Sequence, residues 1–563
     1  MRIQKYLIVA LLGAMTFAAC TKDEGVGIKT REDYQGKVEN GIPTYPDYYI
    51  DVAGWDYRMS WNLANVHDPS IAYYDGYYYM FGTDASYGNE HDKASIGRHF
   101  QGKRSKDLVN WTHIYGPFNE APTWVKDSLN SIRGRMNLDP IENPNYGYWA
   151  PVIRVVDGKL RMYYSIVIDN QIDGKNSWGE RAFIGMCETT DPSNWLAWED
   201  HGYVVGSSTD KSPEKFREGT DANGISSYGN AYFYYNAIDP TYIVDQDGKH
   251  WLIYGSWHSG FALMEIDPAS GKPKAAYDDN GNFVGLGEPW NANPNYGTRI
   301  ATRHKTYRWQ GSEGPEIIYK GGYYYLFMAY DGLDVPYNTR VLRASSVEGP
   351  YYDITGNNNT ENGGDTYPIV THPYAFNGSH GWVGISHCAI FQQEGTGDWF
   401  YCSQGRLPGG VYENASSNAI MMGHVRRIVW VPSSADDLDD LWPLSLPERY
   451  AGLAKTTVKA SEIAGTYEHI NLKYQAGVQQ TPTLLNLASD GTMSGALSGT
   501  WTFDESNQYL TLAPTSGTKV VVAVFHEADW DASPRKETVV YAGTHKSLNA
   551  TWWGKKVETT STE

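Results

Sequence analysis

The sequence predicts an all-β protein, a five-bladed β-propeller followed by a small C-terminal antiparallel β-barrel-like domain. Three observations predict this fold. One short pattern recurs five times, and Asp-Gly and Gly-Gly turns separate paired apolar runs. After Leu446-Pro447-Glu448 the five-fold pattern stops, and strand-like runs with a different spacing begin. We therefore expect a propeller over residues 47–450 and a second β-domain over residues 451–563.

The five copies of the pattern each run into an apolar strand, a Gly turn and a second strand. They lie roughly 75 to 90 residues apart, which suits a four-stranded blade with loop insertions. They begin at His67-Asp68-Pro69, Trp149-Ala150-Pro151, Ile238-Asp239-Pro240, Glu313-Gly314-Pro315 and Ser386-His387-Cys388. Long polar insertions separate them, at residues 123–145, 206–230 and 356–381. Five blades close into a ring, so matching positions should meet on one axis.

The C-terminal domain shows strand-like runs separated by turn signals such as Ser489-Asp490-Gly491. We expect strands at residues 466–472, 484–488, 499–503, 509–513, 519–525, 538–543 and 550–553. Nothing in this domain resembles a catalytic set. His526, Glu527 and Asp529 lie close together, and we interpret them as a solvated turn.

Composition narrows the possible functions. The formal net charge of −19 argues against a nucleic-acid partner, which requires a basic surface. Aromatic residues make up 14% of the 563 residues, which suits β-strand packing and also offers flat faces for sugar rings. Cys187, Cys388 and Cys402 are too few for a disulfide framework. For Cys388 and Cys402 we expect buried thiols, with a bridge between them as the alternative.

Residues 1–20 form an apolar leader with a basic start, ending in Phe17-Ala18-Ala19-Cys20. This ending resembles a bacterial lipobox, which implies that Cys20 is lipidated. The following Thr21-Lys22-Asp23-Glu24 resembles the signal that exports lipoproteins to the surface of a Gram-negative outer membrane. We therefore expect membrane attachment through Cys20 and a flexible tether over residues 21–46. An ordinary secretory leader is the alternative.

Four copies can be aligned on their Pro, and the fifth on Cys388, which stands in its place. This alignment puts Asp68, Asp239 and His387 at the same position, with Glu313 one residue earlier. On innermost strands, these side chains would approach the mouth of the central channel. Three acids there would repel one another and lose solvation, so one should stay protonated near neutral pH. Glycosidic cleavage needs one carboxylate as base and one carboxylic acid as donor. Single Asp-Pro pairs also serve as turn caps, which is the structural alternative.

These segments resemble glycoside hydrolase family 43, and within it the two-domain endo-1,5-α-L-arabinanases. The resemblance rests on the segments 67–70, 149–151, 236–240, 255–256, 259–260, 313–315, 384–391 and 422–426. It implies that Asp68 is the general base, Glu313 the general acid and Asp239 the residue that tunes and orients Glu313. It also implies that Trp149, Asn236 and Ser259 contact substrate, and that His387 faces a calcium ion.

Three residues depart from the pattern of the family. His258 stands where an aromatic residue is common, Gly314 stands where Ala is common, and Glu316 is an acid that could compete with Glu313. The leading hypothesis is an inverting hydrolase of internal α-1,5 bonds of arabinan, a side chain of pectin. The alternatives are an exo-acting α-L-arabinofuranosidase or β-xylosidase, and a non-catalytic surface glycan-binding protein.

Overall fold

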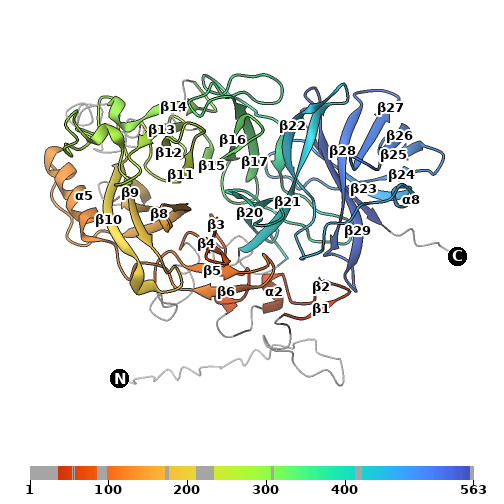
Figure 1. The fold of residues 1–563 in the computed structure, drawn as a ribbon, viewed down its shortest axis with the longest axis horizontal. Helices are drawn as coiled ribbons and strands as arrows, with labels where there is room; N and C mark the ends of the chain where they lie inside the picture. Colours follow the sequence, from red (N-terminus) through yellow and green to blue (C-terminus); the bar gives the residue numbers. More distant parts are fainter. Residues whose placement is uncertain are drawn as a thin grey trace, which may run out of the picture.

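The computed structural model describes residues 34, 36–52, 55, 58–84, 98–170, 177–210, 234–305, 310–411 and 421–557. It confirms the predicted fold class. A five-bladed propeller carries a closed barrel on one side (Figure 1). Cys20, the leader, most of the tether and most of the insertion 206–230 lie outside the described residues.

Within the described ranges, each blade is a four-stranded antiparallel sheet whose strands follow sequence order. Blades 1 and 2 contain β3 (Ser70–Tyr74), β4 (Tyr77–Phe81), β5 (Gly102–Ser105), β6 (Trp111–Ile114), β7 (Tyr146–Val156), β8 (Lys159–Asn170), β9 (Ser177–Thr189) and β10 (Glu199–Gly206). Blade 3 contains β11 (Thr241–Val244), β12 (His250–Tyr254), β13 (Phe261–Ile266) and β14 (Thr298–Ala301). Blades 4 and 5 contain β15 (Ser312–Lys320), β16 (Tyr323–Tyr330), β17 (Asn338–Ala344), β18 (Ile369–Thr371), β19 (Ala389–Gln392), β20 (Trp399–Gly405), β21 (Met422–Ser434) and β22 (Asp437–Ser445).

The first strand of each blade is the innermost strand. β3 contacts β7 and β19, and β11 contacts β7 and β15, while β15 also contacts β19, so these five strands close a ring. The second residue of each copy has a left-handed backbone: φ is 47° at Asp68, 37° at Ala150, 56° at Asp239, 56° at Gly314 and 54° at His387. Residues other than glycine rarely adopt positive φ, so five equivalent cases indicate one turn repeated around the axis.

The C-terminal domain is a closed barrel of eight described strands. They are β23 (Gly465–Leu472), β24 (Thr483–Leu487), β25 (Thr492–Gly495), β26 (Gly499–Asp504), β27 (Tyr509–Pro514), β28 (Val520–Asp529), β29 (Lys536–Thr544) and β30 (Thr551–Val557). The sequence did not predict β25, which is short and has a single buried residue, Met493. The barrel packs against the propeller through contacts of β28 and β29 with β21.

The interpretation of residues 526–529 as a solvated turn was wrong. All of them belong to β28, and Glu527 is fully buried. Arg427 of β21 provides the reason, because its guanidinium pairs with the Glu527 carboxylate at 2.8 Å across the domain interface. Cys388 and Cys402 are buried free thiols, as expected, so the alternative bridge between them is not formed, and Cys187 is also a buried free thiol.

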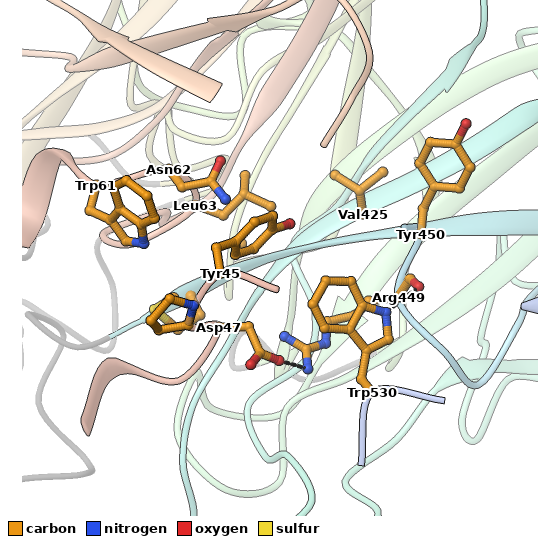
Figure 2. Close-up of a pocket in the computed structure, with 12 residues that line it drawn as sticks. Tyr45, Asp47, Trp61, Asn62, Leu63, Val425, Arg449, Tyr450 and Trp530 are labelled. Atoms are coloured by element: carbon orange, nitrogen blue, oxygen red, sulfur yellow. Dashed lines mark hydrogen bonds and ion pairs between the residues drawn. The ribbon is translucent and has the colours of Figure 1, made fainter. Parts of the chain in front are cut away.

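The segment before the first blade joins the two domains. It contains β1 (Val38–Glu39), β2 (Ile42–Pro43), α2 (Tyr49–Val52) and η1 (Arg58–Ser60). Figure 2 shows the Asp47 carboxylate directed at Arg449, beside the indole of Trp530 from the barrel. Asp47 also pairs with Arg535 of the barrel. Further along, Asn65 donates to the Met421 carbonyl and Gly423 donates to the Leu63 carbonyl, so this segment also contacts the last blade.

The remaining described helices are short or lie in insertions. They are α5 (Thr123–Arg135), η2 (Trp195–Ala197), η4 (Lys274–Ala276), η5 (Pro294–Tyr296) and α8 (Ala460–Ile463). In α5, Val125, Leu129 and Ile132 recur at helical spacing and are buried against blade 2, so this polar-looking insertion has one apolar face. None of the helices among the described residues has the length and apolarity needed to cross a lipid bilayer.

Candidate active site

The structure brings Asp68, Asp239, Glu313 and His387 together at the ring of innermost strands. A chain of contacts connects them across the axis. His387 Nδ1 lies 3.1 Å from Asp68 Oδ1, and its ring lies against Gly314, whose backbone N–H donates to Asp239 Oδ2 at 3.2 Å. Tyr337 completes the chain, since its hydroxyl lies 2.7 Å from Glu313 Oε1 and 3.5 Å from His387 Nδ1.

Asp68 is fixed by groups from two blades. Thr83 donates to Asp68 Oδ2 at 2.7 Å, and the same hydroxyl accepts the backbone N–H of Ala150 at 2.7 Å. Gln404 accepts the backbone N–H of Asp68 at 2.9 Å. The carboxylate is therefore held at blade 1, and Thr83 couples it to blade 2.

Glu313 receives three hydrogen bonds from neutral donors. Ser256 Oγ and Trp257 Nε1 lie 2.9 Å and 2.7 Å from Oε2, and Tyr337 donates to Oε1. Ser256 and Trp257 lie in the loop between β12 and β13, and Tyr337 precedes β17. These contacts orient the carboxyl group without placing a counter-charge on it.

His387 explains why residue 314 is Gly. A Cβ at this position would lie 2.8 Å from His387 Cγ, and the backbone φ of +56° also disfavours a side chain. The imidazole thus packs on the peptide that follows Glu313. The absence of a side chain at Gly314 leaves the space for this contact.

The negative charges of the three acids affect the pKa of His387. Burial alone would lower its pKa, but the carboxylates of Asp68 and Asp239 outweigh burial and raise the pKa of His387 to about 10. Burial would likewise raise the pKa of Asp68, but the adjacent His387 and the Thr83 hydrogen bond hold it well below its usual range. Asp68 is therefore the ionised member of the set.

The other two acids shift in the opposite direction. Burial raises the pKa of Asp239 to about 7, and the nearby carboxylates of Glu313 and Asp68 add to this shift against the charge of His387. Burial also raises the pKa of Glu313, although His387 and the Tyr337 hydrogen bond oppose it. One site thus holds an ionised carboxylate and carboxyl groups that retain a proton more readily, the pairing that general acid–base chemistry requires.

The three side chains expected to contact substrate lie at the same end of the propeller. Trp149 is half-buried in β7, next to Ala150, and packs against Val167, Ala182 and Ile238. Asn236 accepts a hydrogen bond from Ser207 Oγ at 3.0 Å. Ser259 is half-buried, with a left-handed backbone, in the loop that also carries Ser256 and Trp257. His258, between them, is buried.

Glu316 does not join the acid set. Its carboxylate receives Arg154 Nη2 at 2.8 Å on both oxygens and Thr241 Oγ1 at 2.7 Å. These partners lie on β7 and β11, so the ion pair ties three innermost strands together below the channel mouth. Because a buried, paired carboxylate is already satisfied, Glu316 cannot compete with Glu313 for a ligand.

The fit of a calcium ion at His387 can be tested on the donor set. Calcium takes six to eight oxygen ligands, whereas His387 offers one imidazole nitrogen. Its Nδ1 faces Asp68, which leaves Nε2 as the nitrogen available to a cation. The surrounding acids favour positive charge here, either as the proton that His387 retains or, once Nε2 has lost that proton, as a cation on this single His ligand with water completing the shell. Among the described residues, three carboxylates that lie close enough together to hold a metal ion occur away from His387, at Glu448, Asp529 and Asp531.

Sequence reasoning did not identify the residues that support the acids. Ser256 and Trp257 lay within a motif that was noted, but nothing indicated that they hold Glu313. Tyr337 and Thr83 follow no repeat register, and Gln404 comes from a strand far along the chain. Only the ring geometry places them beside the acids.

Two family profiles match the chain. The profile "Glycosyl hydrolases family 43" matches residues 63–422, which includes all four channel residues, and "C-terminal lipocalin-like domain" matches residues 447–554. The second profile begins directly after β22, the last strand of blade 5, whereas the first profile ends at the start of β21.

Curated relatives share both domains. An extracellular endo-α-(1→5)-L-arabinanase of Thermotoga petrophila is 26% identical over 89% of this chain and 96% of its own length. An extracellular endo-α-(1→5)-L-arabinanase 2 of Bacillus subtilis is 26% identical over 87% and 93%. The crystal structure of the endo-1,5-α-L-arabinanase from Thermotoga petrophila RKU-1 aligns with a TM-score of 0.64 and 25% identity, covering 89% of this chain and 100% of that one.

Proposed function

The chain belongs to glycoside hydrolase family 43, and we propose on this basis that it is an inverting hydrolase of internal α-1,5-L-arabinofuranosidic bonds in arabinan. The observation that carries the proposal is the convergence of Asp68, Asp239 and Glu313 around one channel mouth, with opposite pKa shifts. The full-length similarity to two endo-arabinanases supports the choice of substrate.

Asp68 acts as the general base in this proposal. It is ionised, and His387 and Thr83 leave it little freedom to rotate. Its task is to take a proton from the water that attacks the anomeric carbon on the face opposite the leaving group. Inversion follows, because the water and the leaving oxygen occupy opposite sides of the sugar ring.

Glu313 acts as the general acid. An indole N–H is a donor only, so Oε2, which faces Trp257, must stay an acceptor. The acidic proton therefore resides on Oε1, where the Tyr337 hydroxyl can turn and accept. From Oε1 the proton passes to the glycosidic oxygen as the bond breaks.

Asp239 acts on Glu313 through its backbone. Its Oδ2 accepts the N–H of Gly314, the peptide directly after Glu313, and the nearby carboxylate of Glu313 in turn helps to raise the pKa of Asp239. Asp239 is in this proposal a positioning residue that keeps Glu313 protonated and aimed at the channel. Trp149, Asn236 and Ser259 would bind the sugar rings on either side of the scissile bond.

Product analysis tests the proposal. The wild type should release a ladder of arabino-oligosaccharides from linear arabinan in the first minutes, with inverted anomeric configuration by NMR, and Glu313→Gln should release almost none. An exo-acting relative, the arabinofuranosidase ArbA of Cellvibrio japonicus, is 26% identical over 59% of this chain. Arabinose alone from the earliest time points would therefore replace the endo proposal with an exo one. Binding of arabinan without new reducing ends would replace it with a glycan-binding function.

Two further proposals concern cofactor and location. His387 would hold a calcium ion that contributes positive charge near the base. Lipidated Cys20 would display the enzyme on the outer membrane of a Gram-negative bacterium; the two relatives are named extracellular. Cys20→Ser should move the protein from the membrane fraction to the soluble fraction, and an unchanged distribution would refute the anchor.

A further inference from the structure

A second groove lies at the seam between blade 5 and the barrel. It is a hollow of about 420 Å³, within the range of small-ligand pockets. Four half-buried aromatic side chains line it: Trp399 of β20, Trp430 of β21, Tyr509 of β27 and Phe525 of β28. In Figure 1, β21 and β28 run side by side at this seam, and the two strands are in contact.

The groove lies on the face of the propeller opposite the candidate active site. Glu313 stands at the start of β15, and Lys320, which lines the groove, ends the same strand. At about 3.3 Å per residue, this strand separates the two by roughly 20 Å. Gln392, at the end of β19, also lines the groove, whereas His387 precedes the start of that strand. The groove therefore cannot be a subsite of the catalytic channel.

The aromatic walls are held rigidly. The rings of Trp399 and Trp430 meet edge to face with centroids 6.0 Å apart, and the Tyr509 hydroxyl donates to the Trp430 carbonyl at 3.3 Å. The Lys320 amine lies 4.4 Å from the centre of the Trp430 ring. Fixed aromatic side chains from both domains thus meet in one hollow, and they offer apolar faces of the kind on which sugar rings stack.

Four charged side chains line the groove, namely Lys320, Arg427, Lys455 and Asp398, and all of them except Lys320 are joined in ion pairs. Asp398 pairs with Arg427 and with Lys455 at 3.1 Å each, and Arg427 also pairs with Glu527. The exposed amides of Gln392 and Asn507 add uncharged donors and acceptors at the rim. Aromatic faces with amides and largely ion-paired charges suit a hydroxyl-rich ligand better than an apolar peptide.

We propose that this seam groove, built by Trp399, Trp430 and Tyr509, is a second binding site for a neutral oligosaccharide segment of the polymeric substrate. The proposal rests on the proposed function, because the bound polymer is the one that the channel would cleave. Since the two sites face opposite ways, the groove holds a different stretch or strand of the polymer. It increases retention on arabinan and has no part in cleavage of short chains.

Retention on immobilised linear arabinan tests the groove, measured in a Glu313→Gln background so that the polymer stays intact. Adding Trp399→Ala should reduce the retained fraction at least about fivefold, the scale of one aromatic stacking contact. Gln392→Ala with Asn507→Ala, both exposed and unable to disturb the core, should reduce it about twofold. Tyr73→Ala is the matched control, because Tyr73 is an exposed aromatic of β3 that does not line the groove, and it should change nothing.

Kinetics separate this inference from the proposed function. In the active enzyme, Trp399→Ala should leave kcat/KM on a short arabino-oligosaccharide unchanged while slowing release from immobilised arabinan. Equal retention of the parent, Trp399→Ala and the double variant would overturn the groove, and if Trp399→Ala fails to fold, the double variant alone decides. A wild type that cleaves no arabinan but loses retention with Trp399→Ala would refute the hydrolase proposal and keep the groove.

Discussion

Two clusters in this molecule each contain two aspartates, one glutamate and one basic side chain, but the basic side chain contacts the acids differently in the two. The channel holds Asp68, Asp239 and Glu313 around His387, and the interdomain seam holds Glu448, Asp529 and Asp531 around Lys555. In the seam, the lysine amine contacts all three carboxylates, at 3.0 Å, 3.0 Å and 2.7 Å. In the channel, the imidazole contacts only Asp68 directly, and Glu313 is held by neutral donors.

A perturbed pKa does not distinguish the two clusters. Burial raises the pKa of Glu448 to about 7, much as it does for Asp239. The partners differ: a cation that reaches every carboxylate leaves none of them free to react, whereas neutral donors orient a carboxyl group and leave its proton transferable. The Lys555 cluster therefore has the properties of a structural cluster that joins the barrel to the propeller, whereas the channel cluster has those that acid–base chemistry requires.

The largest expected effect comes from removing one acid of each cluster. Glu313→Gln should lower kcat/KM on linear arabinan by about 10³-fold, because the amide cannot donate the proton to the leaving oxygen. Glu448→Gln is the matched change in the seam and should leave kcat/KM within about twofold, since the site is distant and uncoupled. Steady-state kinetics on both purified variants measure the contrast, and similar losses in both would abolish the distinction.

Removing the cation of the seam should cost stability. Lys555→Met leaves the buried carboxylates of Glu448 and Asp529, with the exposed Asp531 beside them, without the lysine that pairs with all three, so the free energy of unfolding should fall by about 3–5 kcal/mol. Denaturant titration followed by fluorescence measures it. Lys459→Met removes an exposed surface pair and should change the free energy of unfolding by less than about 1 kcal/mol. A neutral result at Lys555 would show that the seam does not depend on its cation.

The cation of the channel can be probed with a chelator. If calcium occupies the site at His387, chelation should reduce activity by roughly tenfold and added calcium should restore it. His387→Gln should start from a reduced activity and respond to neither treatment. His372→Gln alters a buried histidine outside the channel and should retain the response. An unaffected wild type would leave the protonated imidazole as the positive charge in the channel.

The smallest expected effect is a shift in pH dependence. The Tyr337 hydrogen bond lowers the pKa of Glu313, so Tyr337→Phe should raise it. The acid works only when protonated and activity is lost as pH rises through its pKa. The alkaline limb of the kcat/KM profile should therefore move to higher pH, by up to about one unit. Tyr330→Phe removes a buried hydroxyl bonded to Thr366 and should leave the limb in place; movement to lower pH in Tyr337→Phe would contradict the assignment.

The sequence predicted the positions that the repeat itself specifies. The five copies predicted where the strands begin, which acids face the channel and where the propeller ends. They could do so because residues at the same place in each repeat lie at the same end of the channel once the ring closes. Ser256, Trp257 and Tyr337 lay beyond such reasoning, since they reach Glu313 from loops whose paths depend on the closed ring. Glu527 was misjudged because its partner, Arg427, is a hundred residues earlier in the chain. Local polarity predicted a turn, and a long-range ion pair made that residue part of a buried strand.

The segment before the first blade has a consequence for the integrity of the ring. All four strands of blade 5 come from one continuous stretch of chain, so within the described residues no N-terminal strand completes the last blade and locks the circle. Closure depends on a latch instead, in which residues 63–65 bond to residues 421–423 and Asp47 is clamped by Arg449 and Arg535. A truncated protein that began at the first repeat would keep every propeller strand and still lose the fastening between first and last blades, and the alignment of the three acids would loosen with it.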